Sequence, residues 1–199
     1  CAVKEMHETT EAWVVRRFRE EATLLSQLNH PNIPRVRDFF QLERGPRTLS
    51  YIVMDYVKGQ DLHHELAHKK KLDGPTVERI ALSMLSVLDY LHRLKPSVIH
   101  RDIKPANIIH EASSGEYKLV DFGLARAPSE NTQTQAGTLQ YCSPEQMLGK
   151  ADHRSDLYSL GATLYVLASG QAFQIGSARP MMALCPELKP GLARAIDTA

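Results

Sequence analysis

Apolar residues recur along the chain with two different periods, and each period predicts a different kind of element. After a strand-like opening at residues 1–6, a stripe at steps of three or four marks one face of a helix, formed by Val14, Phe18, Leu25 and Leu28. Residues 35–41 and 49–57 are richer in β-branched and aromatic residues. They predict two strands joined across a turn at 44–46.

Beyond a break at residues 58–59 the pattern becomes mostly helical. One helix face is marked by Ile80, Met84, Val87, Leu88 and Leu91. The most apolar stretch, residues 157–168, predicts a buried core helix, and a further helix is expected to start near Pro190. Short strands are predicted at 98–99, 108–109 and 117–120. The sequence therefore predicts an α+β protein with two lobes and a hinge near residues 55–60.

Composition narrows the classes of function only a little. The 199 residues carry 24 Lys plus Arg and 23 Asp plus Glu, a net charge of +1, so nothing indicates nucleic acid or an anionic membrane as a partner. Three scattered cysteines favour free thiols in a reducing compartment, so a cytoplasmic location is expected. No stretch reaches the roughly 20 apolar residues of a membrane span.

Candidate chemistry is concentrated in two short segments. The first reads H-R-D-I-K-P-A-N, from His100 to Asn107, and the second reads D-F-G, from Asp121 to Gly123. Asn107 and Asp121 are 121 − 107 = 14 positions apart. The first segment alone has five fixed residues at fixed offsets: His, Arg, Asp, Lys and Asn. Such a set arises by chance on the order of once in millions of positions, so this signal is far stronger than one short motif.

In order and spacing, these segments resemble the active site of eukaryotic-type Ser/Thr protein kinases, also called Hanks-type. The rest of the chain contributes further signatures in family order. They are Ala2-Val3-Lys4 for strand three, Glu21 for helix C, Ser143-Pro144-Glu145 for the end of the activation segment, and the run from Asp156 to Gly161 for the following helix. The resemblance implies the two-lobed protein kinase fold, with a small β-rich lobe and a mostly helical lobe.

The resemblance also implies a role for each motif residue. Lys4, held by Glu21, is expected on the α- and β-phosphates of ATP. Asp102 is expected to orient the substrate hydroxyl and accept its proton, while Lys104 neutralises charge on the transferred phosphate. Asn107 and Asp121 are expected to bind Mg²⁺, or Mn²⁺, because oxygen ligands suit hard cations.

The adenine ring is expected at the hinge. Its contacts would be the carbonyl of Asp55 and the amide of Val57, with Met54 at the back of the pocket. Ala2 and Ile109 would enclose the ring from either side.

Other conspicuous residues are expected to be structural. His100 and Phe122 would pack together, with Leu25 and Val36 beside them. Asp156 would hold the backbone of the catalytic loop.

A switch is predicted at Thr134, which lies 138 − 134 = 4 residues before Thr138, the spacing of the family's activating phosphosite. Arg101 and Arg126 are placed to meet a phosphate there. Lys104 and the Gly137-Thr138 pair resemble the Ser/Thr-specific branch, and the simple loops resemble bacterial members. Protein substrates are therefore expected, with dimerisation as a route to autophosphorylation.

Two alternatives remain open. His64 and His68 fall in an H-E-x-x-H pattern that on a helix can bind Zn²⁺ with Glu65 as a base, as in a metalloprotease. The second alternative is a catalytically weak or pseudokinase-like regulatory domain, because fold does not imply activity.

The resemblance divides the chain into residues 1–57, part of the N-lobe, and residues 58–199, the C-lobe. The match begins at strand three, so the glycine-rich loop that covers ATP would precede Cys1. The family's arginine partner for Glu145 would follow Ala199. We therefore expect a segment truncated at both ends, which binds nucleotide weakly by itself.

Overall fold

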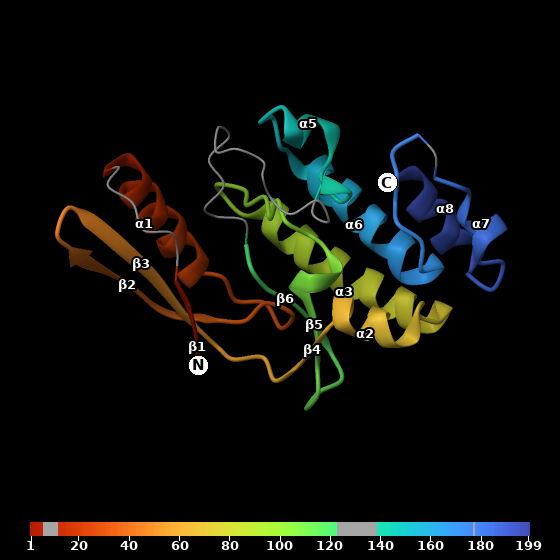
Figure 1. Ribbon diagram of the computed structural model, residues 1–199, viewed down its shortest axis with the longest axis horizontal. Coiled ribbons are helices and arrows are strands. Elements are labelled where there is room, and N and C mark those ends of the chain that lie inside the picture. Colours follow the sequence, from red (N-terminus) through yellow and green to blue (C-terminus); the bar gives the residue numbers. More distant parts are fainter. Residues whose placement is uncertain (6–11, 123–138, 177) are drawn as a thin grey trace.

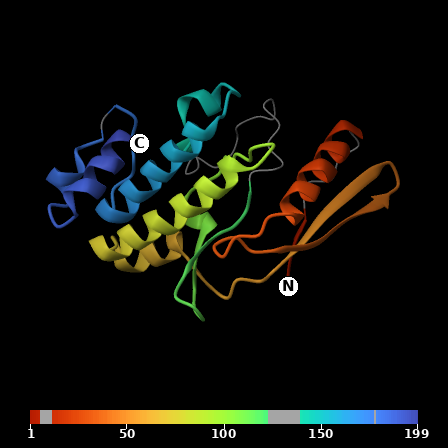
Figure 2. The ribbon, with the colours of Figure 1, turned by 180° about the vertical axis from the view of Figure 1, so that it is seen from behind.

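Two groups of elements meet end to end in the computed structural model: a small sheet with one helix, and a larger group that is mostly helical (Figure 1). The structure describes residues 1–5, 12–122, 139–176 and 178–199, except the side chains at positions 13, 14, 17 and 21. The reverse view shows the same separation, with a single extended stretch leading from β3 toward β4 (Figure 2).

The first group is a three-stranded antiparallel sheet with the order β1-β3-β2. Its strands are β1 (Ala2–Glu5), β2 (Val36–Arg44) and β3 (Arg47–Met54). Gly45 has a φ of +62° in the tight turn between β2 and β3, a conformation that glycine adopts without strain. The helix α1 (Ala12–Ser26) contacts β2 and β3, so the predicted strand, helix, strand and strand are all present.

The register of β1 places Lys4 on a defined face of this sheet. Ala2 lies opposite Met54 and Lys4 opposite Ile52, and residues directly opposite each other project to the same side. Val3, between them, is 61% exposed on the other side. The alternation therefore brings Lys4 over the apolar residues of β3.

Two long helices form the core of the larger group. These are α3 (Gly74–Arg93) and α6 (His153–Ser169), which pack against each other. The predicted stripe of α3 is fully buried, and α6 covers the apolar stretch at 157–168. Asp152 caps the start of α6 through a capping box with Ser155, so the position at which the helix begins is set locally.

A second small antiparallel sheet lies beside these helices, with the order β4-β5-β6. Its strands are β4 (Gly59–Asp61), β5 (Ile108–Glu111) and β6 (Tyr117–Leu119). At Gly59 a Cβ atom would overlap the carbonyl of His110, so β4 approaches β5 too closely for a side chain.

Short helices complete the group. They are α2 (Leu62–Lys69), the 3₁₀ turn η1 (Pro105–Asn107), α5 (Pro144–Met147), α7 (Met181–Leu184) and α8 (Pro190–Thr198). Both α7 and α8 pack against α6, and α8 begins at Pro190 as expected. The predicted α+β architecture is confirmed. Among the described residues, no helix has both the length and the apolar character needed to cross a membrane.

One predicted strand is wrong. Residues 98–99 do not form a strand, because the backbone N–H groups of this stretch have other partners. The N–H of Val98 donates to the carbonyl of Leu91 at the end of α3, and the N–H of His100 donates to the carboxylate of Asp156. A β-ladder would have needed those donors.

The burial of α3 predicts the cost of shortening its apolar stripe. Leu91 has no exposed surface, whereas Leu82 on the same helix is 63% exposed. We expect Leu91→Ala to lower the free energy of unfolding by about 2–5 kcal/mol, because it leaves a cavity in the core. Leu82→Ala should change it by less than about 0.5 kcal/mol. Urea unfolding of both variants measures this difference, and equal losses would contradict the assigned core.

Candidate active site

The side chain of Asp102 lies at the centre of the H-R-D-I-K-P-A-N loop. Its Oδ2 accepts a hydrogen bond from Nδ2 of Asn107 at 2.9 Å, and Nζ of Lys104 lies 3.1 Å from the same oxygen. The Asn107 amide also donates to the Asp102 carbonyl at 2.8 Å. The structure thus brings together the three residues predicted to be catalytic, and it leaves the Asp102 carboxylate mostly buried beside one cation.

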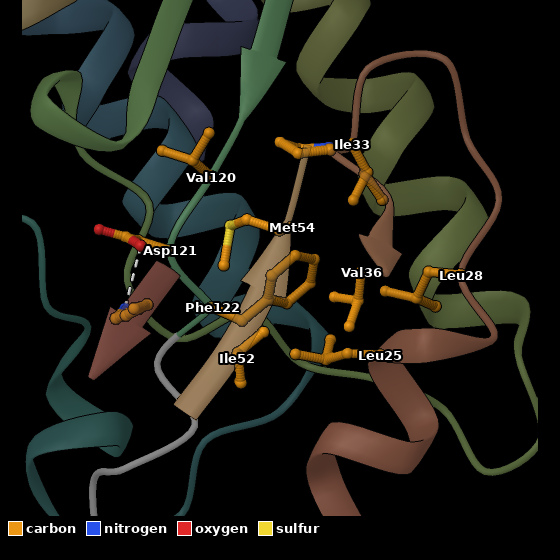
Figure 3. A pocket seen from close by; sticks show the side chains of 11 residues that line it. Leu25, Leu28, Ile33, Val36, Ile52, Met54, Val120, Asp121 and Phe122 are labelled. Carbon is orange, nitrogen blue, oxygen red and sulfur yellow. Dashed lines mark hydrogen bonds and ion pairs between the residues drawn. The ribbon is translucent and has the colours of Figure 1, made fainter. Parts of the chain in front are cut away.

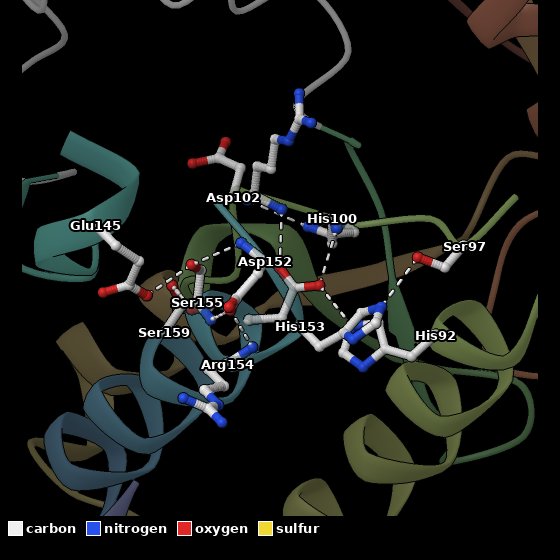
Figure 4. Close-up of polar contacts among 12 residues, drawn as sticks. His92, Ser97, His100, Asp102, Glu145, Asp152, His153, Arg154, Ser155 and Ser159 are labelled. Atoms are coloured by element: carbon white, nitrogen blue, oxygen red, sulfur yellow. Dashed lines mark hydrogen bonds and ion pairs between the residues drawn. The ribbon is translucent and has the colours of Figure 1, made fainter. Parts of the chain in front are cut away.

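The backbone of this loop is fixed by Asp156, whose side chain is completely buried at the start of α6. Its two carboxylate oxygens accept the N–H groups of His100 and Arg101, each at 2.9 Å. A third contact comes from Nε2 of His92 on α3, also at 2.9 Å. His92 and His100 thus contact this carboxylate from two different parts of the chain; both histidines are labelled in Figure 4. The expected structural role of Asp156 agrees with this geometry, because a buried carboxylate requires such donors.

Lys4 contacts the second motif directly. Its Nζ lies 3.0 Å from Oδ1 of Asp121. Figure 3 shows Asp121 at one side of the pocket, with a dashed line for this ion pair. Asp121 has a φ of +58°, a left-handed conformation that is unusual for a residue with a side chain. The expected contact between Lys4 and Glu21 lies outside the described residues, since they do not include the Glu21 side chain.

Phe122 links the motif to helix α1. Its ring centroid is 4.6 Å from that of His100, and Figure 3 shows it pointing toward Leu25 and Val36. The expected packing of these four residues is therefore present. The pocket that Phe122, Leu25 and Val36 line together with Lys4 and Asp121 has a volume of about 20 Å³, room for about one water molecule. This is a packed apolar contact and is too small for a nucleotide.

The residues expected around adenine are spread along the hinge and both sheets. Met54 ends β3 opposite Ala2, while Ile109 pairs with Asp61 and Lys118 in the second sheet.

Asp55 and Val57 line a different, larger cavity of about 340 Å³ with Arg37 and other polar residues. The Asp55 carboxylate accepts two hydrogen bonds from Arg37, at 2.6 and 3.1 Å. That contact lowers the pKa of Asp55.

Glu145, at the end of the predicted activation segment, has a partner within the chain. Its Oε1 accepts a hydrogen bond from Oγ of Ser155 at 2.6 Å, a contact drawn in Figure 4. Hydrogen bonds from Ser155 and then Ser143 lower the pKa of Glu145, so the carboxylate stays ionised. Sequence reasoning missed Ser155 and His92, because neither belongs to a motif. The only signal for His92 was a titratable residue next to an apolar helix stripe.

The H-E-x-x-H pattern does not assemble a site. His64 lies on α2 with its Nδ1 2.7 Å from Asp61, and both His64 and His68 are exposed. Glu65, the base of that hypothesis, is instead buried and bonded to Lys69. Helix α2 thus packs this glutamate inward while both histidines face the solvent. Within the described residues, no group of three or more His, Cys, Asp or Glu side chains is placed to hold a metal ion.

Several predicted residues cannot be compared with the structure. Gly123, Arg126, Thr134 and Thr138 lie outside the described residues. Arg101 is described and is partly buried, with a left-handed φ of +66° directly before Asp102.

Comparison with known proteins agrees with this geometry. A family model described as "Protein kinase domain" matches residues 1–181. The chain is 44% identical over 167 residues to a probable serine/threonine-protein kinase PknB of Bifidobacterium longum, covering 78% of this chain and 24% of that protein. It is 43% identical over 168 residues to the serine/threonine-protein kinase pkn3 of Myxococcus xanthus, covering 78% and 30%. For PknB of Mycobacterium leprae the identity is 42% over 170 residues, covering 80% and 26%. The chain thus spans about a quarter to a third of the length of these relatives.

The burial of His100 predicts a pH dependence of stability. Burial lowers the pKa of this histidine, so the folded state keeps it neutral. The unfolded chain takes up a proton near pH 6.5, so it binds more protons than the folded chain at lower pH, and stability falls as the pH decreases. Between pH 7 and 5 we expect His100 to contribute a loss of up to about 2 kcal/mol.

Chemical unfolding at several pH values tests this. His100→Phe, which keeps a ring against Phe122, should flatten the decrease between pH 7 and 5. The matched control, His68→Phe at an exposed position, should keep the wild-type slope. An unchanged slope in His100→Phe would show that the imidazole titrates normally in the folded protein.

Proposed function

This chain belongs to the protein kinase family, and we propose that the protein carrying it transfers the γ-phosphate of ATP to serine and threonine hydroxyls of protein substrates. The observation that carries the proposal is the arrangement around Asp102, with Asn107 and Lys104 both on its Oδ2. Phosphoryl transfer depends on positioning and on neutralising charge more than on covalent chemistry. A carboxylate fixed beside a cation supplies both requirements.

In this proposal Asp102 accepts a hydrogen bond from the substrate hydroxyl and takes its proton as the phosphoryl group moves. The amide of Asn107 holds the carboxylate in place, which reduces the orientational freedom lost during reaction. Lys104 lies beside Asp102, close enough to contact the phosphate while it is transferred to the hydroxyl that Asp102 holds. Its ammonium group neutralises the negative charge that develops on that phosphate. The acceptor is a serine or threonine, since the relatives described above carry the name serine/threonine-protein kinase.

Asn107 and Asp121 are the proposed ligands of Mg²⁺ or Mn²⁺, and both fit that task. Because Nδ2 of Asn107 is bonded to Asp102, its Oδ1 is left as an acceptor, without a hydrogen bond from the described residues. Asp121 adds a half-exposed carboxylate. Hard divalent cations prefer such oxygen donors. When bound, the ion neutralises the phosphates of ATP. Lys4, now on Asp121, is within reach of the same phosphates, and Glu21 is the proposed partner that holds it.

The adenine ring of ATP is proposed to lie at the hinge, against the Asp55 carbonyl and the Val57 amide. Met54, Ala2 and Ile109 would provide its apolar surroundings. The division into residues 1–57 and 58–199 follows the same hinge. Dimerisation for autophosphorylation belongs to the proposal and rests only on the family resemblance. Neither alternative reading is favoured by an observation. The motif residues are present in the sequence, and the exposed His64 and His68 belong to no metal-binding group of three side chains within the described residues.

The test of the reaction is Asp102→Asn in the full-length protein. We expect turnover of a protein substrate to fall by about 10²–10⁴-fold, because the amide cannot accept the proton. The dissociation constant of MgADP should change little, since Asp102 contacts the acceptor. Asp89→Asn, which alters an exposed carboxylate on α3, is the control and should retain wild-type turnover. Phosphate transfer by Asp102→Asn at the wild-type rate would rule out this assignment.

A second test concerns regulation at Thr134. A phosphothreonine there carries about −1.5 to −2 charges, and Arg101 and Arg126 are its proposed partners. Thr134→Ala and Arg101→Ala should each lower activity on the order of tenfold, a typical coupling between sites. The double variant should lose little more than either single one, because both changes break one contact. Thr132→Ala is the control. Phosphopeptide mapping of the active enzyme decides the site, and an unmodified Thr134 in fully active protein would exclude it.

A further inference from the structure

The peptide bond that leads into Asp102 starts from a strained residue. Arg101 has a φ of +66° although it has a bulky side chain. Such a conformation is strained for a residue with a side chain and persists only where neighbouring groups hold it. Because Asp102 follows directly, the groups that hold Arg101 also set the direction in which the Asp102 side chain leaves the backbone.

Two side chains hold Arg101 from opposite sides. Its N–H donates to Oδ1 of Asp156 at 2.9 Å, and its carbonyl accepts from Nε2 of Gln146 at 2.7 Å. That carbonyl belongs to the same peptide unit as the N–H of Asp102, which donates to Nδ1 of His100 at 3.3 Å. Gln146 and His100 therefore fix the two ends of the peptide plane between Arg101 and Asp102.

Gln146 is itself held by helix α5. The Ser143 hydroxyl caps this helix by accepting the N–H of Gln146, and the preceding Glu145 accepts a hydrogen bond from Ser155 on α6. Ser155 is adjacent in sequence to Asp156. The contacts therefore close a cycle, which runs from Arg101 through Asp156 and Ser155 to Glu145 and Gln146 and back to Arg101. Figure 4 shows the part of this cycle between Glu145 and Ser155.

We propose that Gln146 is a positioning residue for phosphoryl transfer, acting through Arg101 on the orientation of Asp102. The inference rests on the proposed function, because Asp102 must be the residue that receives the hydroxyl. It adds a coupling: the contact between Glu145 and Ser155 holds α5 on α6, and α5 presents the Gln146 carboxamide to the Arg101 carbonyl. Since α5 contains Glu145, at the end of the predicted activation segment, the placement of α5 is transmitted to Asp102.

Gln146→Ala in the full-length protein is the first experiment. It leaves the Arg101 carbonyl without its donor, and we expect kcat to fall about ten- to hundredfold, as small misplacements of a catalytic group do. The KM for ATP should change less than threefold, because Gln146 contacts neither Lys4 nor Asp121. The matched control is Met147→Ala, the next residue of α5, whose side chain is 48% exposed. It should retain wild-type kcat.

Gln146→Glu separates positioning from packing. The side chain keeps its length, but a carboxylate cannot donate to the Arg101 carbonyl, whereas a protonated carboxyl group can. Its kcat relative to wild type should therefore be low at pH 8 and rise as the pH falls toward 5. The same ratio for Gln146→Ala should stay constant over that range. A role limited to filling space would not produce this pH profile.

The outcomes distinguish this inference from the proposed function. If wild-type protein transfers phosphate and Asp102→Asn does not, while Gln146→Ala keeps wild-type kcat, the inference is wrong and the function stands. An equal loss in Met147→Ala, or parallel pH profiles for the two Gln146 variants, would also overturn it. If wild-type protein transfers no phosphate, the proposed function fails first.

Discussion

The carboxylate of Asp156 is the constraint on which the active-site geometry depends. A charge with no exposed surface is costly to bury unless donors surround it. Here the donors are the backbone N–H groups of His100 and Arg101 and the imidazole of His92. The backbone N–H groups of the loop before Asp102 consequently find their hydrogen-bond acceptor in a side chain of a core helix instead of in a β-ladder. Because α6 is packed against α3 and capped at Asp152, the position of this loop is set by the buried helical core of the larger group.

The two ion pairs of the site differ in how much of their side-chain surface is exposed to water. Lys4 and Asp121 form an ion pair with side chains 35% and 46% exposed, and an exposed pair contributes little to stability because water and salt screen it. Such a pair can exchange partners at small cost when phosphate or a cation arrives. Lys104 and Asp102 are less exposed, so their interaction is screened less. The more exposed pair, Lys4 and Asp121, thus lies where the nucleotide phosphates are proposed to bind. The less exposed pair, Lys104 and Asp102, lies where the substrate hydroxyl is proposed to bind.

Apolar packing connects these two charged regions to the small lobe. The ring of Phe122 lies between His100 on one side and the α1 residue Leu25 on the other, and the pocket around it is nearly filled. A displacement of α1 would therefore disturb Phe122 and, with it, the adjacent Asp121. Interiors packed this closely transmit small shifts. The helix α1, which carries Glu21, is therefore mechanically linked to Asp121, the proposed metal ligand.

The sequence by itself determined the elements whose signals are local. The apolar stripe of α3 and the continuous apolar stretch of α6 are readable because side-chain burial repeats with the period of the helix. The motif residues were readable because their chemistry requires particular side chains at short spacings. Only the tertiary structure decided that residues 98–99 leave the β-pattern, that Glu65 is buried, and that Lys4 pairs with Asp121. It also decided that Gln146 bonds to Arg101, 45 positions away. These contacts join segments far apart in the chain, so their partners are chosen by how the helices and sheets pack, which no local pattern encodes.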